Sequence, residues 1–271
     1  MIEEGKEIAK TIKDVPRILE LIYKDLAQPS VKKVGKALGT VFELSNTILL
    51  PVKLMNEKVL LNYEKHMNSY KEKLNEIPEE EICEVPPEIG IPITEKLTYT
   101  TNDEIADLFT SLLTKASSEK TINQAHPSFV QLIERLSVDE GQIIRYLKGK
   151  AEIPCISQRL HQKDKKGYIE VKKRLTGIEV YLRLTFPRNI KTYLDNLESM
   201  GIISIDPSVH KMDNKLYEPL EMIYKSAMAQ FEKEEMKGYF QKVEWKRGFY
   251  EITDFGRLFI NACTFGKNKP K

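Results

Sequence analysis

Helical periodicity dominates the first part of the chain. Apolar residues recur at steps of three and four over residues 8–26 and again over 55–77. This spacing places apolar side chains on one face of an α-helix, so it predicts amphipathic helices over both ranges. We expect a third helix within residues 31–50, with a break at Pro51, because proline has no amide hydrogen to donate. Together these elements define an N-terminal region, residues 1–77.

A proline-rich stretch follows at residues 78–98. Pro86 and Pro87 are adjacent, and Pro92 comes five residues later. Proline removes a backbone donor and restricts the residue before it to extended conformations. The sequence therefore predicts a connector or an extended segment here.

Helix-start signals mark the central region, residues 99–150. Thr101 with Glu104 and Ser137 with Glu140 have the spacing of capping boxes, in which the two side chains satisfy each other's free backbone amides. Apolar residues at helical spacing follow each pair. We therefore predict that this region is helical.

The last region, residues 151–271, mixes helical and strand patterns. Alternation of apolar and polar residues over 178–184 predicts a strand. Gly201 is expected to end a helix in the left-handed conformation. A helix is predicted at residues 190–200, a strand at 202–205 and a second helix at 219–235. Two strand runs follow on either side of residues 246–248, and a last helix is predicted at 255–262.

This order resembles a winged helix, in which a recognition helix, a strand and a wing hairpin follow one another. The chain departs from the usual pattern because residues 206–238, with a helix of their own, separate the strands. The predicted fold class is mainly α: N-terminal and central helical regions, then a C-terminal α+β winged-helix-like region with an inserted helix.

Charge adds a candidate surface to this picture. The net charge of the 271 residues is only +2, yet basic residues greatly outnumber acidic ones between Arg145 and Lys191. A winged helix that binds DNA would use basic and polar residues of this stretch, the helix start and the wing. These candidates are Lys172, Lys173, Arg174, Arg188, Asn189, Lys191, Lys246 and Arg247. Asp195 and Glu198, on the exposed side of the same helix, would repel phosphate and favour a protein-contact role instead.

Catalytic and metal-binding patterns are not found in the sequence. The three cysteines, Cys83, Cys155 and Cys263, have no zinc-site spacing, and the four histidines are dispersed. We therefore predict no catalytic residue, no metal, no cofactor and no small-molecule substrate. Tyr63, His66 and Tyr70 share one helix face and are interpreted as a buried stripe.

Membrane contact is a further alternative for the N-terminal helices. Gly35 and Gly39 form a G-x-x-x-G pair, which favours close helix packing, and an apolar run ends at Leu49 and Leu50. Tight packing within a helical bundle is the preferred interpretation. The run is shorter than the roughly 18 residues of a membrane-spanning helix, and the N-terminus has no secretory signal. With the unpaired cysteines, these features predict a cytoplasmic protein.

Five segments together resemble the abortive infection alpha (Abi-alpha) family over about residues 31–263. They read KKVGKALGTVFEL, PEEEICEVPPEIGIPITEKLTYTTNDEIADLFTSLLTKAS, AHPSFVQLIERLSVDEGQII, YLDNLESMGIISI and ITDFGRLFINAC. The resemblance implies a bacterial role in defence against phage, without an assigned catalytic residue. The first hypothesis is an anti-phage protein that acts through macromolecular contacts, with a protein partner or by self-association. The alternatives are a winged-helix nucleic-acid-binding regulator and a membrane-active toxin that uses the N-terminal helices.

Overall fold

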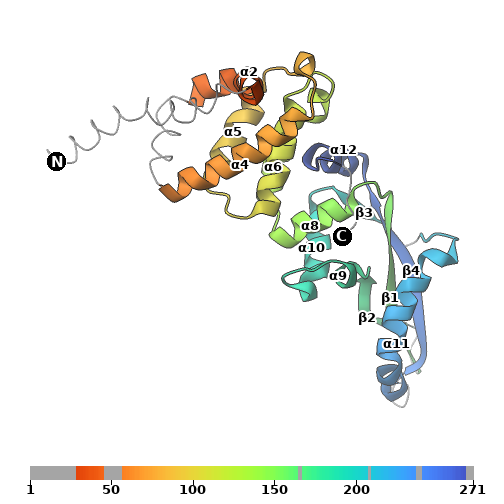
Figure 1. Ribbon diagram of the computed structural model, residues 1–271. Coiled ribbons are helices and arrows are strands. Elements are labelled where there is room, and N and C mark those ends of the chain that lie inside the picture. The colour runs from red at the N-terminus through yellow and green to blue at the C-terminus, as the bar shows by residue number, and fades with distance from the viewer. Residues whose placement is uncertain (1–28, 46–56, 164–166, 207–208, 236–239, 267–271) are drawn as a thin grey trace. The chain divides into compact units, whose positions relative to one another are not determined.

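A computed structural model describes five stretches of the chain, residues 29–45, 57–163, 167–206, 209–235 and 240–266. They form two compact units, Met1–Gly141 with Leu258–Lys271, and Gln142–Arg257 (Figure 1). The predicted helix over residues 8–26, the break at Pro51 and the pair Leu49 and Leu50 lie outside the described residues.

The first unit is built of helices. They are α2 (Pro29–Ser45), α4 (Glu57–Asn75), α5 (Pro87–Leu97), α6 (Asp103–Ala116), α7 (Ser128–Glu134), the first part of α8 (Val138–Leu147), the last part of α12 (Asp254–Cys263), and the 3-10 turns η2 (Glu79–Glu81) and η3 (Ile122–Gln124). Helix α6 is central, since α4, α5 and α7 all pack against it (Figure 1). Its apolar residues Leu108, Phe109 and Leu112 are buried. Phe259 of α12 packs edge-on against Phe129 of α7, with ring centroids 5.2 Å apart.

The alternative of an extended segment over residues 78–98 was wrong, because α5 (Pro87–Leu97) is helical; the role of the stretch as a connector stays a prediction. Pro87 is the first residue of the helix, where a missing amide costs nothing. Pro92 lies inside the helix and removes one backbone hydrogen bond. Burial of Ile89, Ile93 and Leu97, four residues apart, offsets that loss. Packing therefore overrides the local effect of the prolines.

The N-terminal caps of α8 and α6 can be compared with the two predicted capping boxes. The prediction at Ser137 is confirmed, since its amide donates to Glu140 Oε2 at 2.6 Å and the Glu140 amide donates to Ser137 Oγ at 3.3 Å. The capping residue of α6 is Asn102, not Thr101, and its Oδ1 accepts from the amides of Glu104 and Ile105. Asparagine is a good N-cap residue, so the start shifts by one position only.

The second unit contains a four-stranded antiparallel sheet in the order β2-β1-β4-β3. Its elements, besides the parts of α8 and α12 within it, are β1 (Glu152–Gln162), β2 (Tyr168–Leu175), α9 (Ile178–Tyr181), η4 (Pro187–Asn189), α10 (Ile190–Ser199), β3 (Ile203–Ile205), η5 (Asn214–Leu216), α11 (Glu218–Glu235) and β4 (Phe240–Ile252). Helix α11 covers one face of the sheet, where Tyr217 and Leu220 pack on Ile156. Gly201 has φ 72°, as predicted for the end of α10.

Two strand predictions in this unit were wrong. Residues 178–184 begin with the short helix α9 rather than a strand, and Val180 is 57% exposed. The residues around Lys246–Gly248 form no hairpin turn, because β4 is continuous and pairs with β1 throughout. Strands need a partner, and the long partner of β4 is far away in sequence, since Ile156 pairs with Arg247 across 91 positions. Local alternation and a Lys-Arg-Gly triplet cannot reveal such a pairing.

Candidate functional site

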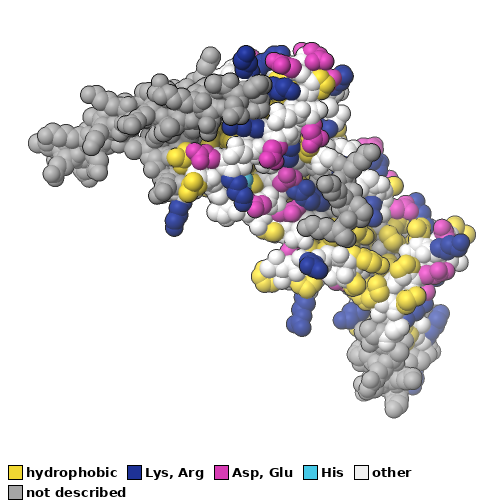
Figure 2. All heavy atoms as spheres, viewed as in Figure 1, with side chains coloured by type: hydrophobic (Ala, Val, Ile, Leu, Met, Phe, Trp, Pro, Cys, Tyr) yellow, Lys and Arg dark blue, Asp and Glu magenta, His cyan; other side chains and the backbone are white. Residues whose placement is uncertain are grey.

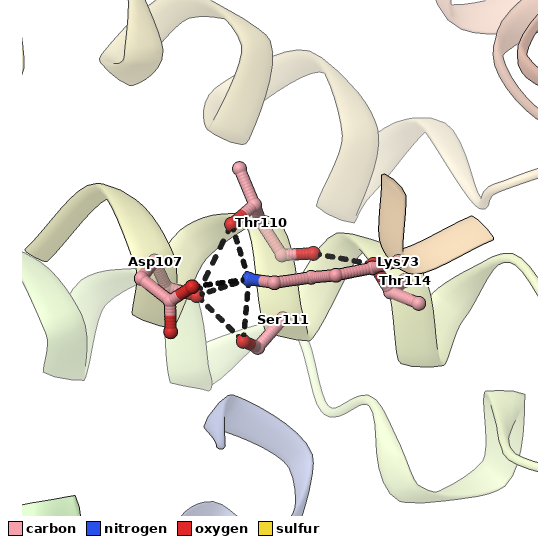
Figure 3. A network of polar contacts seen from close by, with 5 residues as sticks. All are labelled: Lys73, Asp107, Thr110, Ser111 and Thr114. Atoms are coloured by element: carbon pink, nitrogen blue, oxygen red, sulfur yellow. Dashed lines mark hydrogen bonds and ion pairs between the residues drawn. The ribbon is translucent and has the colours of Figure 1, made fainter. Parts of the chain in front are cut away.

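A buried lysine joins α4 to α6 in the first unit (Figure 3). The side chain of Lys73 is only 11% exposed, and its Nζ lies 2.6 Å from Asp107 Oδ1. It also donates to Thr110 Oγ1 at 2.6 Å, to Ser111 Oγ at 2.9 Å and to the Asp107 carbonyl at 3.1 Å. The ammonium group is thus neutralised by one carboxylate and solvated by three further oxygen atoms, as a buried charge requires.

The hydroxyl groups around Lys73 are oriented by the backbone of α6. Ser111 donates to the Asp107 carbonyl at 2.6 Å, and Thr110 donates to the same carbonyl at 3.2 Å. Each hydroxyl in contact with Lys73 therefore offers it a lone pair. In some hydrolases a lysine is the general base for a neighbouring serine, which is the nucleophile. Here the serine is completely buried, so this cluster holds two helices together and presents no nucleophile to a substrate.

The aromatic stripe of α4 is buried, as predicted. Tyr63, His66 and Tyr70 are at most 3% exposed. His66 Nε2 contacts the Thr100 carbonyl at 2.8 Å, and the Tyr70 hydroxyl contacts Ser117 Oγ at 2.6 Å. Burial raises the pKa of Tyr70, which keeps the phenol neutral. Lys73 continues this stripe one helical turn beyond Tyr70, and that spacing is the signal by which the sequence could have revealed it.

No group of three or more potential metal ligands occurs among the residues that the structure describes. Besides His66, two of the histidines there have other contacts. His126 hydrogen-bonds to Ser128 at 2.7 Å, and His161 to Glu244 at 2.9 Å.

Two of the residues predicted to contact nucleic acid form ion pairs with acidic residues of their own unit. Arg174, which has the left-handed φ of 54°, lies 3.1 Å from Glu198 and 4.0 Å from Asp195. Arg247 lies 2.8 Å from Glu221. Burial raises the pKa of Glu221, but hydrogen bonds and charges from Lys225 and Arg247 outweigh it and hold that pKa below its usual value.

The other residues predicted to contact nucleic acid lie on three different elements. Lys172 and Lys173 are exposed on the edge strand β2, and Lys246 is half-buried on β4 opposite Ser157. A third set, Arg188, Asn189 and Lys191, is exposed at η4 and the beginning of α10. The role of all these residues stays a prediction.

Helix α9 and the segment after it contribute a surface of which sequence analysis named only Arg188 and Lys191. We call it the α9–α10 surface and define it by exposed apolar residues and exposed cations: Val180, Tyr181, Phe186, Arg183, Arg188 and Lys191. Tyr181 is 54% and Phe186 62% exposed. Figure 2 shows hydrophobic and Lys or Arg side chains close together in the region of α9 and α10. The signal in the sequence was an aromatic residue two positions before each arginine, which the expectation of a strand over residues 178–184 concealed.

The glycine pair of α2 makes no close helix contact among the described residues. A Cβ at Gly35 would meet open space, and one at Gly39 would lie 4.0 Å from Glu84 Oε1. The close contact with α2 is made instead by Gly90 of α5, because a Cβ at Gly90 would overlap with Val41 of α2. Within the described part of the chain, no helix combines the length and the apolar composition needed to cross a bilayer.

The family model for abortive infection alpha matches residues 55–263. This is most of the chain, and the protein therefore belongs to the abortive infection alpha family. Among curated proteins, none matches the chain significantly. A solved structure of an uncharacterized protein from the hydrocarbon-degrading marine bacterium Alcanivorax borkumensis SK2 is similar at 14% identity, over 49% of this chain and 90% of that chain, with a TM-score of 0.31. A TM-score this low does not establish a shared fold.

Proposed function

We propose that this protein defends bacteria against phage and that it does so through contacts with other macromolecules rather than through catalysis. The observation that carries the proposal is membership of the abortive infection alpha family over residues 55–263. Phage defence is the activity that this family name denotes.

The contact mechanism is supported by how the reactive side chains are used. The hydroxyl of Ser111, which accepts a hydrogen bond from Lys73, is buried and donates to the backbone. Burial raises the pKa of the Cys155 thiol to about 12, which keeps it protonated and unreactive. The α9–α10 surface, in contrast, exposes groups suited to binding.

The defence role is tested by producing the full chain in a phage-sensitive bacterial host and measuring plaquing efficiency over a broad panel of phages. Two variants control for folding. Leu112→Asp places a charge in the core of the first unit and should abolish protection, whereas Leu61→Asp, at a residue that is 58% exposed, should retain it. Truncation at residue 150 would be misleading, since it also removes Phe259 from the first unit. Absence of protection, with or without neighbouring genes, would overturn the proposal.

The non-catalytic mechanism has its own test. Ser111→Ala, His126→Ala and His161→Ala each remove a potential reactive group, and each should leave protection unchanged. Circular dichroism shows whether the variant is folded. Loss of protection by any folded variant would show that this side chain belongs to a functional site and would contradict the absence of such a site around it.

A winged-helix function is a second candidate. Support comes from the order α9, α10, β3, β4, together with the pairing of β3 to β4 and of β4 to β1, since a winged helix has its strands in this arrangement. The wing would then be the connection between β3 and β4 that carries α11. A membrane-active toxin has weaker support, because Leu49 and Leu50 lie outside the described residues and Gly35 makes no close helix contact there.

A further inference from the structure

The α9–α10 surface carries three cations that have no acidic partner in the part of the chain that the structure describes. Arg183, Arg188 and Lys191 are exposed and make no ion pair among the described residues, unlike Arg174 and Arg247. Glu179, the acidic residue within α9, accepts a hydrogen bond from Tyr224 of α11. Its charge is therefore directed to the interior side of α9, and the surface keeps a positive charge that attracts phosphate.

Aromatic rings accompany these cations. Phe186 and Tyr181 are more than half exposed, although burying such rings is favourable. Tyr181 lies near Tyr146 at the end of α8: burial raises the pKa of Tyr146, and the nearby Tyr181 hydroxyl raises it further. Lys150 lies over the Tyr146 ring, with Nζ 4.3 Å from the centroid, and so extends the basic surface. Exposed rings among cations can stack on bases while the cations contact phosphates.

Double-stranded DNA fits this surface less well. A winged helix inserts its recognition helix into the major groove. On α10 the groove-facing side would include Asp195, which is exposed, and Glu198, which is paired with Arg174. Carboxylates in the groove would be repelled by the flanking phosphates. The rings, Arg183 and Arg188 lie before α10, so a single strand can reach them without lying along the acidic side of that helix; Lys191 lies in its first turn, one turn before Asp195.

We propose that the α9–α10 surface binds single-stranded nucleic acid, with Phe186 and Tyr181 stacking on bases and Arg183, Arg188 and Lys191 contacting phosphates. The proposal rests on the proposed function, because it names the macromolecule through which the defence role is exerted.

Binding is measured by fluorescence anisotropy with the full chain and a labelled single-stranded DNA of mixed sequence, about 16 nucleotides long. The same sequence is tested as RNA and as duplex DNA. We expect the single strands to bind more tightly than the duplex, and log Kd to vary linearly with log salt. Changing Arg183, Arg188 and Lys191 to Gln should reduce the slope by about 0.7 for each residue.

Stacking is tested at Phe186. Phe186→Ala should weaken binding by about 5- to 150-fold, the range for a lost base–aromatic stack. Phe186→Trp should bind as tightly as the natural chain, and Phe186→Leu should bind nearly as weakly as Phe186→Ala. This ranking separates stacking from a general hydrophobic contact. The matched controls are Met222→Ala, at an apolar residue 73% exposed on α11, and Lys215→Gln, at an exposed lysine of η5. Both should bind normally.

Several results would overturn the inference. They are absence of single-strand binding at low salt, preference for the duplex, equal binding by Phe186→Leu and Phe186→Trp, or loss of binding only when Lys172 and Lys173 on β2 are changed to Gln. If the surface binds an acidic protein instead of nucleic acid, no single-strand binding is expected at low salt.

Plaquing separates this inference from the proposed function. Phe186→Ala and Phe186→Leu should lose protection, and Phe186→Trp should keep it. Protection that persists in a variant without nucleic-acid binding would refute the inference and leave the defence role intact. If the natural chain binds single strands but protects against no phage, the defence role fails while the binding site stands.

Discussion

Lys73→Met tests whether the buried ion pair holds α4 to α6. Methionine keeps most of the side-chain volume but removes the charge, so Asp107 loses its cation and two hydroxyls lose a donor. Loss of one partner of a fully buried pair costs about 3–5 kcal/mol. Asp107 is 27% exposed and retains some water. We therefore expect the free energy of unfolding of the first unit to fall by about 2–4 kcal/mol.

A matched control lies on the same two helices. Lys65 of α4 pairs with Asp103 of α6 at 2.5 Å, but their side chains are 59% and 69% exposed. Lys65→Met should cost at most about 1 kcal/mol, because water solvates both charges. A double variant, Lys73→Met with Asp107→Leu, should be more stable than Lys73→Met alone, since no unpaired carboxylate remains.

The assay is amide hydrogen exchange of α4 and α6, since the single tryptophan, Trp245, lies in the second unit and does not report on the first. The protection of these amides should fall strongly in Lys73→Met and little in Lys65→Met. If the two variants lose the same protection, or if the double variant is the least stable, the reasoning about the buried pair is wrong.

Gly90→Ala should lower the stability of the first unit by about 1–3 kcal/mol, because its methyl group would overlap with α2. In contrast, Gly35→Ala on α2 should raise stability by about 0.5–1 kcal/mol, since it has open space and alanine favours the helix; equal shifts in thermal unfolding would contradict both. Glu221→Gln should destabilise the second unit at neutral pH, measured by urea unfolding with Trp245 fluorescence. Because the folded pKa of Glu221 is lowered, its contribution is complete above the unfolded value of 4.5 and is lost as the pH falls through the folded pKa. If the difference in free energy of unfolding between the natural chain and Glu221→Gln does not shrink in acid, the ionised Glu221 carboxylate is not what stabilises the unit.

Much of the helical structure follows from the sequence alone. The apolar stripe of α4, the capping pair Ser137 and Glu140, and the left-handed Gly201 are local features. Each depends on residues within one or two helical turns, so their spacing carries the information. Family membership follows from the sequence as well, because it depends on the order of segments along most of the chain.

The tertiary structure decided what depends on distant partners. Pro92 lies in a helix because Ile89 and Ile93 are buried by neighbouring helices. Lys246 and Arg247 lie in the middle of a strand because β1 pairs with them. In the same way, Arg174 is neutralised by Glu198 of α10, whereas Arg188 is exposed and has no ion pair within the described part of the chain. A basic residue binds a ligand only if its own fold leaves it unpaired, and this is settled by side chains that packing brings together from distant parts of the chain.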